Sequence, residues 1–179
     1  MSSTTFERIA QDESRPQGIV SRRLIFCTYL QGNFTTDELA PNCESCGRFF
    51  VLCCNHRKTI GRICHHYRIA FIDGACLGNG RDDATAGIGV ALGKLELYND
   101  QWAIPVQDSM DPNHPKRTSQ RTELLAAIEG LKKLELAESS TEGDRYRHSQ
   151  PEDPKARSEW VIATDSEYVV KGITEWFPA

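Results

Sequence analysis

The chain has 179 residues, of which 39% are hydrophobic and 26% are charged, a composition typical of a soluble globular protein rather than a disordered one. This length suits one domain of ordinary size with an extension, and it is too short for two domains with deep cores. No segment approaches the ~20 consecutive apolar residues of a membrane-spanning helix, and no cleavage pattern follows the apolar run at 24–30, so we expect no secretory signal and a location in the nucleus or cytoplasm.

Charge and cysteine content narrow the class of protein further. Residues 1–68 carry nine Lys and Arg against six Asp and Glu, a net charge of +3, whereas residues 69–179 carry twelve against nineteen, a net charge of −7. A protein surface that binds a phosphate backbone is normally basic, not acidic. The negative charge of the second segment therefore either surrounds metal ions, or the basic surface that would bind nucleic acid is missing from this chain. The seven cysteines predict reduced thiols, some of them on a metal, rather than a disulfide framework.

The first 66 residues divide into two segments. Residues 1–41 form a polar extension that we interpret as mostly linker, with a short strand-like piece over 23–30. Residues 42–66 are rich in cysteine and histidine, and the apolar run at 49–52 predicts one short strand there.

The sequence Cys-x-x-Cys-Gly at 43–47 is typical of turns that bind zinc, because the glycine lets backbone amides approach the thiolates. The chain supplies further ligands downstream, and the candidate zinc set is Cys43, Cys46, Cys53, Cys54, His56 and Cys64. The spacing of the second half matches no established zinc pattern, and Cys53 and Cys54 can equally be small apolar residues packed in a strand. The sequence of this segment is compatible both with zinc binding and with simple packing of the cysteine side chains.

From residue 67 the pattern changes to alternating strands and helices. Apolar and β-branched runs predict strands at 69–72, 86–93, 102–106 and 160–163. Capping residues and helical spacing predict a long helix from residue 118 or 119 to 137, and a shorter one after Asp165 that reaches Trp176. Residues 138–158 contain almost no apolar side chains and predict a solvated insertion.

The connections between these elements predict an α/β fold. Sequential strands joined by short loops favour an antiparallel meander of three strands. The strand reached through the long helix is expected to lie parallel to one of the three, by a right-handed crossover. A mixed sheet with helices packed on it follows.

Three carboxylates occupy positions where such a sheet can bring them together. Asp73 lies on or just after the first strand, Glu123 in the first turn of the long helix, and Asp165 where the last strand becomes a helix. Each also has an ordinary structural explanation. Asp73 precedes Gly74 as in a tight hairpin, Glu123 can favour the positive end of the helix dipole, and Asp165 can be a helix N-cap.

The segments around these carboxylates resemble, in the same order, three successive motifs of type 1 ribonuclease H. They are IAFIDGAC at 69–76, TSQRTELLAAIEGL at 118–131 and ATDSEYVVKGITEW at 163–176. Three motifs in the right order are far more specific than one acidic motif. The resemblance covers residues 67–179 and implies a ribonuclease H-like mixed sheet, in which Asp73 and Gly74 belong to a continuing strand.

By this resemblance, Asp73, Glu123 and Asp165 are catalytic residues that hold two Mg²⁺ ions, with Mn²⁺ as an alternative. The implied function is an endonuclease that hydrolyses the RNA strand of RNA/DNA hybrids and leaves 5′-phosphate and 3′-hydroxyl ends. Two hard cations ~4 Å apart favour carboxylate oxygens, and together they can generate the attacking hydroxide and neutralise the leaving oxygen.

The same resemblance implies that Ser119, Gln120 and Arg121 bind the minor groove of the hybrid. Polar side chains suit this position because the 2′-hydroxyl is the feature that distinguishes the RNA strand there. Helix capping and solvent contact explain these residues equally well. Cys76, inside the first motif, is expected to be a packed thiol.

The family also has a fourth acidic residue, usually preceded by a histidine on a loop, beyond the motif that ends at Trp176, whereas this sequence stops at Ala179. We therefore expect a ribonuclease H domain without its final strand and helices. Such a chain is expected to be unstable and nearly inactive alone, whereas an extension that supplies the missing strand and the fourth carboxylate would cleave the RNA of a hybrid with Mg²⁺. Two other functions compete with an active nuclease. One is a non-catalytic remnant of the fold that binds nucleic acid or protein, and the other is a zinc-binding interaction module with a decayed nuclease attached.

Overall fold

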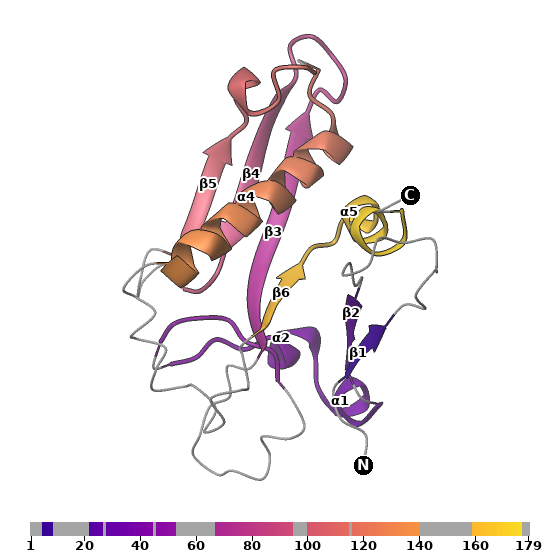
Figure 1. Ribbon diagram of the computed structural model, residues 1–179, viewed down its shortest axis with the longest axis vertical. Helices are drawn as coiled ribbons and strands as arrows, with labels where there is room; N and C mark the ends of the chain where they lie inside the picture. The colour runs from indigo at the N-terminus through magenta and orange to yellow at the C-terminus, as the bar shows by residue number, and fades with distance from the viewer. Residues whose placement is uncertain are drawn as a thin grey trace.

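A four-stranded mixed sheet with one long helix across it forms the centre of the computed structural model (Figure 1). The structure describes residues 5–8, 22–26, 28–44, 46–52, 67–94, 100–114, 116–139 and 159–176. The strands of the main sheet are β3 (Tyr67–Leu77), β4 (Thr85–Ala91), β5 (Gln101–Pro105) and β6 (Glu159–Ala163), in the order β5-β4-β3-β6. The predicted insertion at 138–158 lies outside the described residues except for residues 138 and 139, the end of the long helix.

The pairing of the strands confirms the predicted topology. β3 is antiparallel to β4, β4 is antiparallel to β5, and β6 is parallel to β3. The parallel pair is reached through the long helix α4 (Ser119–Ser139), as a crossover connection requires. No helix in the described part of the chain is both long enough and apolar enough to cross a membrane.

β3 is longer than the sequence predicted, and it continues through Asp73 and Gly74 to Leu77. The two residues are therefore in a strand, opposite Gly89 and Ile88 of β4, and not in a hairpin turn. A Cβ atom on Gly74 would come within 2.6 Å of the backbone carbon of Thr122. Glycine at this position lets the backbone of α4 lie directly on β3.

The buried residues on the face of α4 that meets the sheet are mostly small, and Leu124 and Leu125 pack beside them partly buried. Ala126, Ala127, Leu134 and Ala137 are buried, and a Cβ atom on Gly130 would come within 2.7 Å of Ile72 Cγ2. The larger side chains Ile128 and Leu131 are 48% and 53% exposed. Helical spacing thus predicted the helix correctly, but the small residues decide which face packs on the sheet.

The core continues from α4 to the short helix α5 (Glu167–Lys171), which is followed by the π-type turn η4 (Gly172–Trp176). Val169 of α5 is 1% exposed and packs with Ile72, Ile88 and Val90 of the sheet. The predicted helix that reaches Trp176 is therefore present as these two consecutive pieces.

The N-terminal extension contains more regular structure than the expected linker. β1 (Thr5–Arg8) pairs antiparallel with β2 (Arg22–Ile25), and the helices α1 (Thr28–Asn33) and α2 (Thr36–Leu39) follow. The prediction of a strand over 23–30 is wrong beyond Ile25, because Leu30 is buried from a helix together with Leu39. Arg23 of β2 donates to Thr174 Oγ1 at 3.2 Å and pairs with Glu175, which joins the extension to η4.

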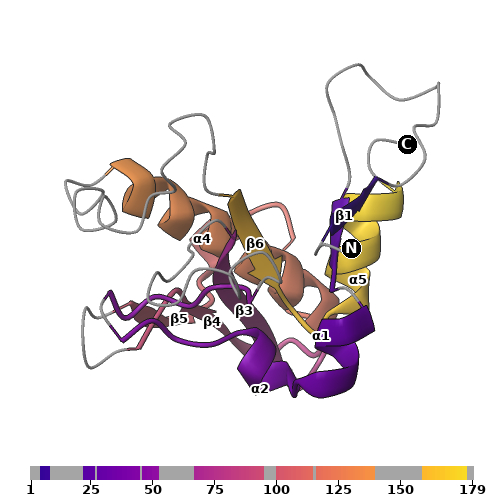
Figure 2. The same ribbon diagram turned by 90° about the horizontal axis from the view of Figure 1, so that it is seen from below.

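Residues 41–52 run along the end of the main sheet (Figure 2). Phe49 donates its N–H to the Leu92 carbonyl at 3.0 Å, and Val51 donates to Tyr67 at 2.8 Å. The predicted short strand at 49–52 is present as isolated bridges, one of which joins Phe50 to Arg68 of β3. The division of the chain into domains at residue 67 stays a prediction.

A buried ion pair holds this segment against the sheet. Arg48 Nε lies 2.9 Å from Asp100 Oδ2, and the two side chains are only 3% and 4% exposed. Phe49 also makes an edge-to-face contact with Phe71 of β3, with ring centroids 5.1 Å apart. The segment therefore packs on the sheet through charged, aromatic and backbone contacts together.

Candidate active site

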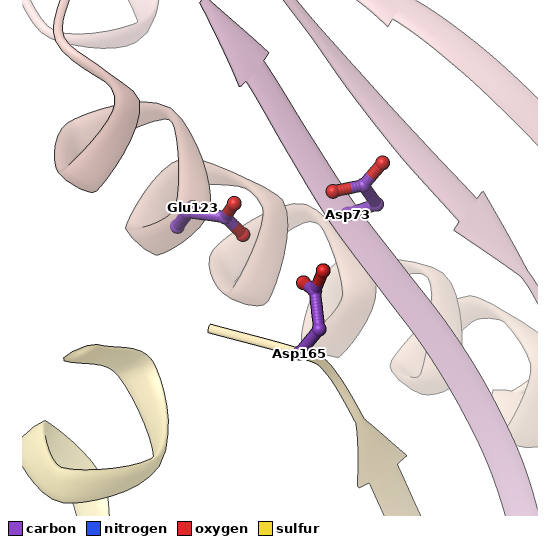
Figure 3. Close-up of side chains that lie close together, drawn as sticks. All are labelled: Asp73, Glu123 and Asp165. Carbon is purple, nitrogen blue, oxygen red and sulfur yellow. The ribbon is translucent and has the colours of Figure 1, made fainter. Parts of the chain in front are cut away.

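Three elements of the fold each direct one carboxylate to the same point (Figure 3). Asp73 comes from the middle of β3, Glu123 from α4, and Asp165 from the turn that follows β6. One carboxylate oxygen of each residue lies within 4.8 Å of the others. The predicted convergence of the three side chains is confirmed.

The register of the parallel pair explains why the two aspartates meet. Phe71 of β3 lies opposite Ala163 of β6, and each aspartate follows its strand partner by two residues. Because side chains alternate with a period of two, both aspartates extend toward the same side of the sheet. Glu123 joins them because Gly74 allows α4 to approach β3 closely.

The structure also excludes the ordinary explanations of the three residues. Asp73 is not at a hairpin turn, because β3 continues beyond it. Glu123 is the fifth residue of α4, and the first turn contains no acidic residue, so the expectation that Glu123 lies in the first turn is wrong and the helix dipole does not explain it. The N-cap of α5 is Ser166, which accepts from the Val169 N–H at 3.3 Å, and not Asp165.

The electrostatics of the cluster favour a bound cation. Burial raises the pKa of the Glu123 carboxyl, the charges of Asp73 and Asp165 raise it further, and a hydrogen bond from the Gly74 backbone acts in the opposite direction. Glu123 Oε2 is buried and has no hydrogen-bond partner among the described residues. A hard divalent cation prefers such carboxylate oxygens, and it would supply the missing partner and neutralise the repulsion.

Comparison with known proteins agrees with this arrangement, since the family model described as RNase H matches residues 65–179. The chain belongs to the RNase H family. It is 34% identical over 111 residues to a ribonuclease H of Thermosynechococcus vestitus, a match that covers 62% of this chain and 52% of that protein. It is 31% identical over 123 residues to a ribonuclease H of Schizosaccharomyces pombe, which covers 69% of this chain and 34% of that protein.

The chain spans about half the length of the first two bacterial relatives it matches, those of Thermosynechococcus vestitus and Pseudomonas entomophila. No solved structure matches it. RNase H proteins generally use divalent metal ions, and the described residues of this family member contain the corresponding acidic cluster. They contain no other group of three or more potential metal ligands as close together.

The predicted hybrid-binding residues lie at the start of α4 in this RNase H-family chain. Ser119 and Gln120 are exposed, whereas the guanidinium of Arg121 pairs with Asp111. Asn79 was not among the predicted residues, and its side-chain oxygen accepts the Ser119 N–H at 3.0 Å. Asn79 lies between two glycines with positive φ, and this Gly-Asn-Gly turn signal could have drawn attention to it.

The zinc candidates divide between described and undescribed residues. Cys43 is buried, Cys46 is half-buried, and both are reduced thiols, as is Cys76 of β3. Burial raises the pKa of the Cys46 thiol to about 11, with a backbone hydrogen bond from Arg48 acting against the shift. The other four candidates, Cys53, Cys54, His56 and Cys64, lie outside the described residues.

Proposed function

We propose that this chain provides the carboxylate site of a hybrid-specific endonuclease, which hydrolyses the RNA strand of RNA/DNA hybrids. The observation that carries the proposal is the meeting of Asp73, Glu123 and Asp165, each from a separate family motif, with carboxylate oxygens within 4.8 Å. Membership of the RNase H family supports the same function. An intracellular location, in the nucleus or the cytoplasm, stays a prediction from the sequence.

In this proposal the three carboxylates hold two Mg²⁺ ions, with Mn²⁺ as an alternative. When bound, the ions supply the positive charge that activates the attacking water and stabilises the leaving oxygen. The side chains themselves act as rigid ligands, because Asp73 lies in a paired strand, Asp165 follows a paired strand by two residues, and Glu123 lies on a packed helix. No side-chain nucleophile is required. The resemblance to type 1 ribonuclease H implies that water attacks phosphorus and displaces the 3′-oxygen, so we expect products with 5′-phosphate and 3′-hydroxyl ends.

Recognition of the RNA strand is assigned to the start of α4. The exposed side chains of Ser119 and Gln120 are suited to contact 2′-hydroxyl groups across the minor groove. Arg121 is proposed to contact the hybrid as well, although its pairing with Asp111 also positions the loop before α4. Asn79 supports this region through its bond to Ser119.

The test is a cleavage assay with an end-labelled RNA/DNA hybrid and with RNA/RNA and DNA/DNA duplexes of the same sequence. We expect slow, Mg²⁺-dependent cleavage of the RNA in the hybrid alone, and end-group analysis should find 5′-phosphates and 3′-hydroxyls. Asp73→Asn removes a charge with little change in shape and should lower the rate by about 10³-fold, since metal ions contribute several kcal/mol to such reactions. The matched control is Asp37→Asn on α2, which should leave the rate unchanged.

Two outcomes would reject the proposal. One is equal cleavage by the wild type and Asp73→Asn, which would place the activity elsewhere or in a contaminant. The other is tight binding of the hybrid without any cleavage at saturating Mg²⁺ or Mn²⁺. That result would favour the non-catalytic, nucleic-acid-binding alternative.

A further inference from the structure

Two loops meet at the end of the main sheet where α4 begins. One joins β3 to β4 through residues 78–84, and the other leads from β5 to α4. Figure 1 shows the two loops side by side at the upper end of the sheet. The Gly80 N–H donates to the Arg117 carbonyl at 2.8 Å, which joins the two backbones directly. Both loops adjoin Ser119, because the Asn79 side chain accepts the Ser119 N–H.

The guanidinium of Arg117 fastens this junction a second time. Its Nη1 atom donates to the Ala84 carbonyl at 2.8 Å, just before β4. Its Nη2 atom donates to Asp108 Oδ1, also at 2.8 Å, in the short turn η2 (Asp108–Met110) of the other loop. The Arg117 side chain is 27% exposed, so most of it lies against the protein. Because the guanidinium is planar and its donors point in fixed directions, these two bonds hold the loops at a set separation.

The position of the recognition residues depends on this junction, whereas the carboxylate site depends on other contacts. Ser119 and Gln120, which the proposed function assigns to the RNA strand, follow Arg117 by two and three residues. Glu123 is placed by the contact of Gly74 with the backbone of α4. Charge-assisted hydrogen bonds of this length are among the stronger kinds in proteins. Loss of Arg117 should therefore shift the start of α4 relative to the β3–β4 loop and leave Glu123 in place.

We propose that Arg117 is a positioning residue for hybrid recognition, which holds the start of α4 and the β3–β4 loop as one rigid surface for the RNA strand. This inference rests on the proposed function, because it concerns how that site selects its substrate. A hydrogen bond to a 2′-hydroxyl weakens steeply when its distance or angle is wrong, whereas the attraction between a cation and a phosphate falls slowly with distance. Loss of Arg117 should therefore weaken the binding of a hybrid more than the binding of a DNA duplex.

The test compares the binding of an RNA/DNA hybrid with that of a DNA/DNA duplex of the same sequence, followed by fluorescence anisotropy. The full chain carries Asp73→Asn, so that the RNA is not cut during the measurement. With Arg117 present, we expect tighter binding of the hybrid. Arg117→Ala should reduce the ratio of the two dissociation constants by about tenfold, which corresponds to the loss of one or two hydrogen bonds. Arg117→Lys keeps the charge but not the planar pair of donors, so it should restore little of the ratio.

Two further variants and a kinetic measurement distinguish positioning from loss of charge or of folding. Arg81→Ala removes an exposed cation from the β3–β4 loop and should leave the ratio unchanged. Asp108→Ala removes one acceptor of Arg117 at a side chain that is 81% exposed. It should lower the ratio less than Arg117→Ala, since the bond to Ala84 remains. In the chain with Asp73 intact, Arg117→Ala should raise KM for the hybrid and leave kcat unchanged.

Equal ratios for the protein with Arg117 and for Arg117→Ala would overturn this inference alone. So would full recovery in Arg117→Lys, or a change of about one in the slope of log Kd against log salt concentration in Arg117→Ala, because either result indicates a direct phosphate contact. If Arg117→Ala does not fold, Asp108→Ala decides, and an unchanged ratio there overturns the inference. A protein that binds both duplexes equally with Arg117 present rejects the proposed function itself, and this inference with it.

Discussion

The carboxylate cluster and the turn that contains Cys43 and Cys46, called the cysteine turn below, are built in opposite ways. Asp73, Glu123 and Asp165 come from three separate elements and repel one another. Cys43 and Cys46 belong to one turn, in which a backbone N–H faces a sulfur. Carboxylates that repel one another stay together only where packed strands and helices hold them. A local turn, in contrast, forms mainly through contacts between residues that are near one another in the sequence. The two regions should therefore respond differently when the packing of the sheet is changed.

The largest effect is expected from Arg48→Ala, which tests how firmly the cysteine-turn segment is joined to the sheet. Removal of Arg48 takes a charged partner away from the buried Asp100 carboxylate, and breaking a buried pair in this way costs about 3–5 kcal/mol. Urea unfolding followed by circular dichroism measures the loss.

Two controls sharpen this measurement. The double variant Arg48→Leu with Asp100→Leu removes both charges and should recover most of the stability. Lys132→Ala breaks the pair with Glu129, in which the lysine side chain is 61% exposed, and should cost less than about 1 kcal/mol. A loss below about 1 kcal/mol in Arg48→Ala would mean that the segment is not needed for the stability of the sheet.

Gly74→Ala should separate the two regions functionally. The added Cβ would meet the backbone of α4 at 2.6 Å, so the helix must move away from β3, at a cost of about 1–3 kcal/mol. This movement takes Glu123 away from Asp73, and hybrid cleavage should fall. Thermal unfolding and the cleavage assay measure the two effects.

The matched control for this variant is Gly32→Ala in α1, where nothing lies within 4 Å of the added Cβ. Alanine in a helix should there be neutral or stabilising by up to about 1 kcal/mol. If Gly74→Ala cleaves the hybrid at the wild-type rate, the close approach of α4 is not what positions Glu123.

A smaller effect is expected from Asn79→Ala at the start of α4. The change removes the acceptor of the Ser119 N–H, and a hydrogen bond of this kind contributes about 1 kcal/mol. Asn113→Ala, at an exposed asparagine in the preceding loop, serves as the control and should change stability little. Equal unfolding midpoints for the two variants in urea would show that Asn79 does not stabilise the helix start.

The smallest change concerns the metal-free protein and its dependence on pH. Folding raises the pKa of the Glu123 carboxyl, so its ionisation lowers the free energy of unfolding at neutral pH. This loss of stability disappears as the pH falls through the raised pKa, because the carboxyl then becomes protonated. Glu123→Gln should therefore be more stable than the wild type at neutral pH in the presence of a chelator. The difference in stability should shrink as the pH falls toward 4.5, the ordinary pKa of a glutamate carboxyl.

Thermal unfolding at several pH values measures this difference. Glu135→Gln, at an exposed position of the same helix, should behave like the wild type throughout. Added Mg²⁺ should stabilise the wild type more than Glu123→Gln, because the ion neutralises the repulsion among three carboxylates in the wild type and between only two in the variant. A Glu123→Gln protein that is less stable than the wild type at neutral pH without metal would contradict the repulsion between the carboxylates.

Much of the sheet could be predicted from the sequence, and the misses have physical causes. Strand runs and connection lengths are local signals, so the antiparallel meander and the parallel fourth strand were foreseen. The ion pair of Arg48 and Asp100 was not foreseen, because the sequence around each residue does not indicate a contact with a residue 52 positions away. The N-terminal helices were also missed, although Thr35 and Glu38 form a capping box whose spacing was visible in the sequence.

By itself, the sequence determined the order of the elements and the identity of the three motif carboxylates, because periodicity and motif order are properties of the chain. Only the tertiary structure decided that small residues, rather than Ile128 and Leu131, face the sheet, since burial depends on the surface that a helix meets. It also decided the separation of at most 4.8 Å between carboxylate oxygens. That distance follows from the register of β3 against β6 and from the contact of Gly74 with α4, which join residues far apart along the chain.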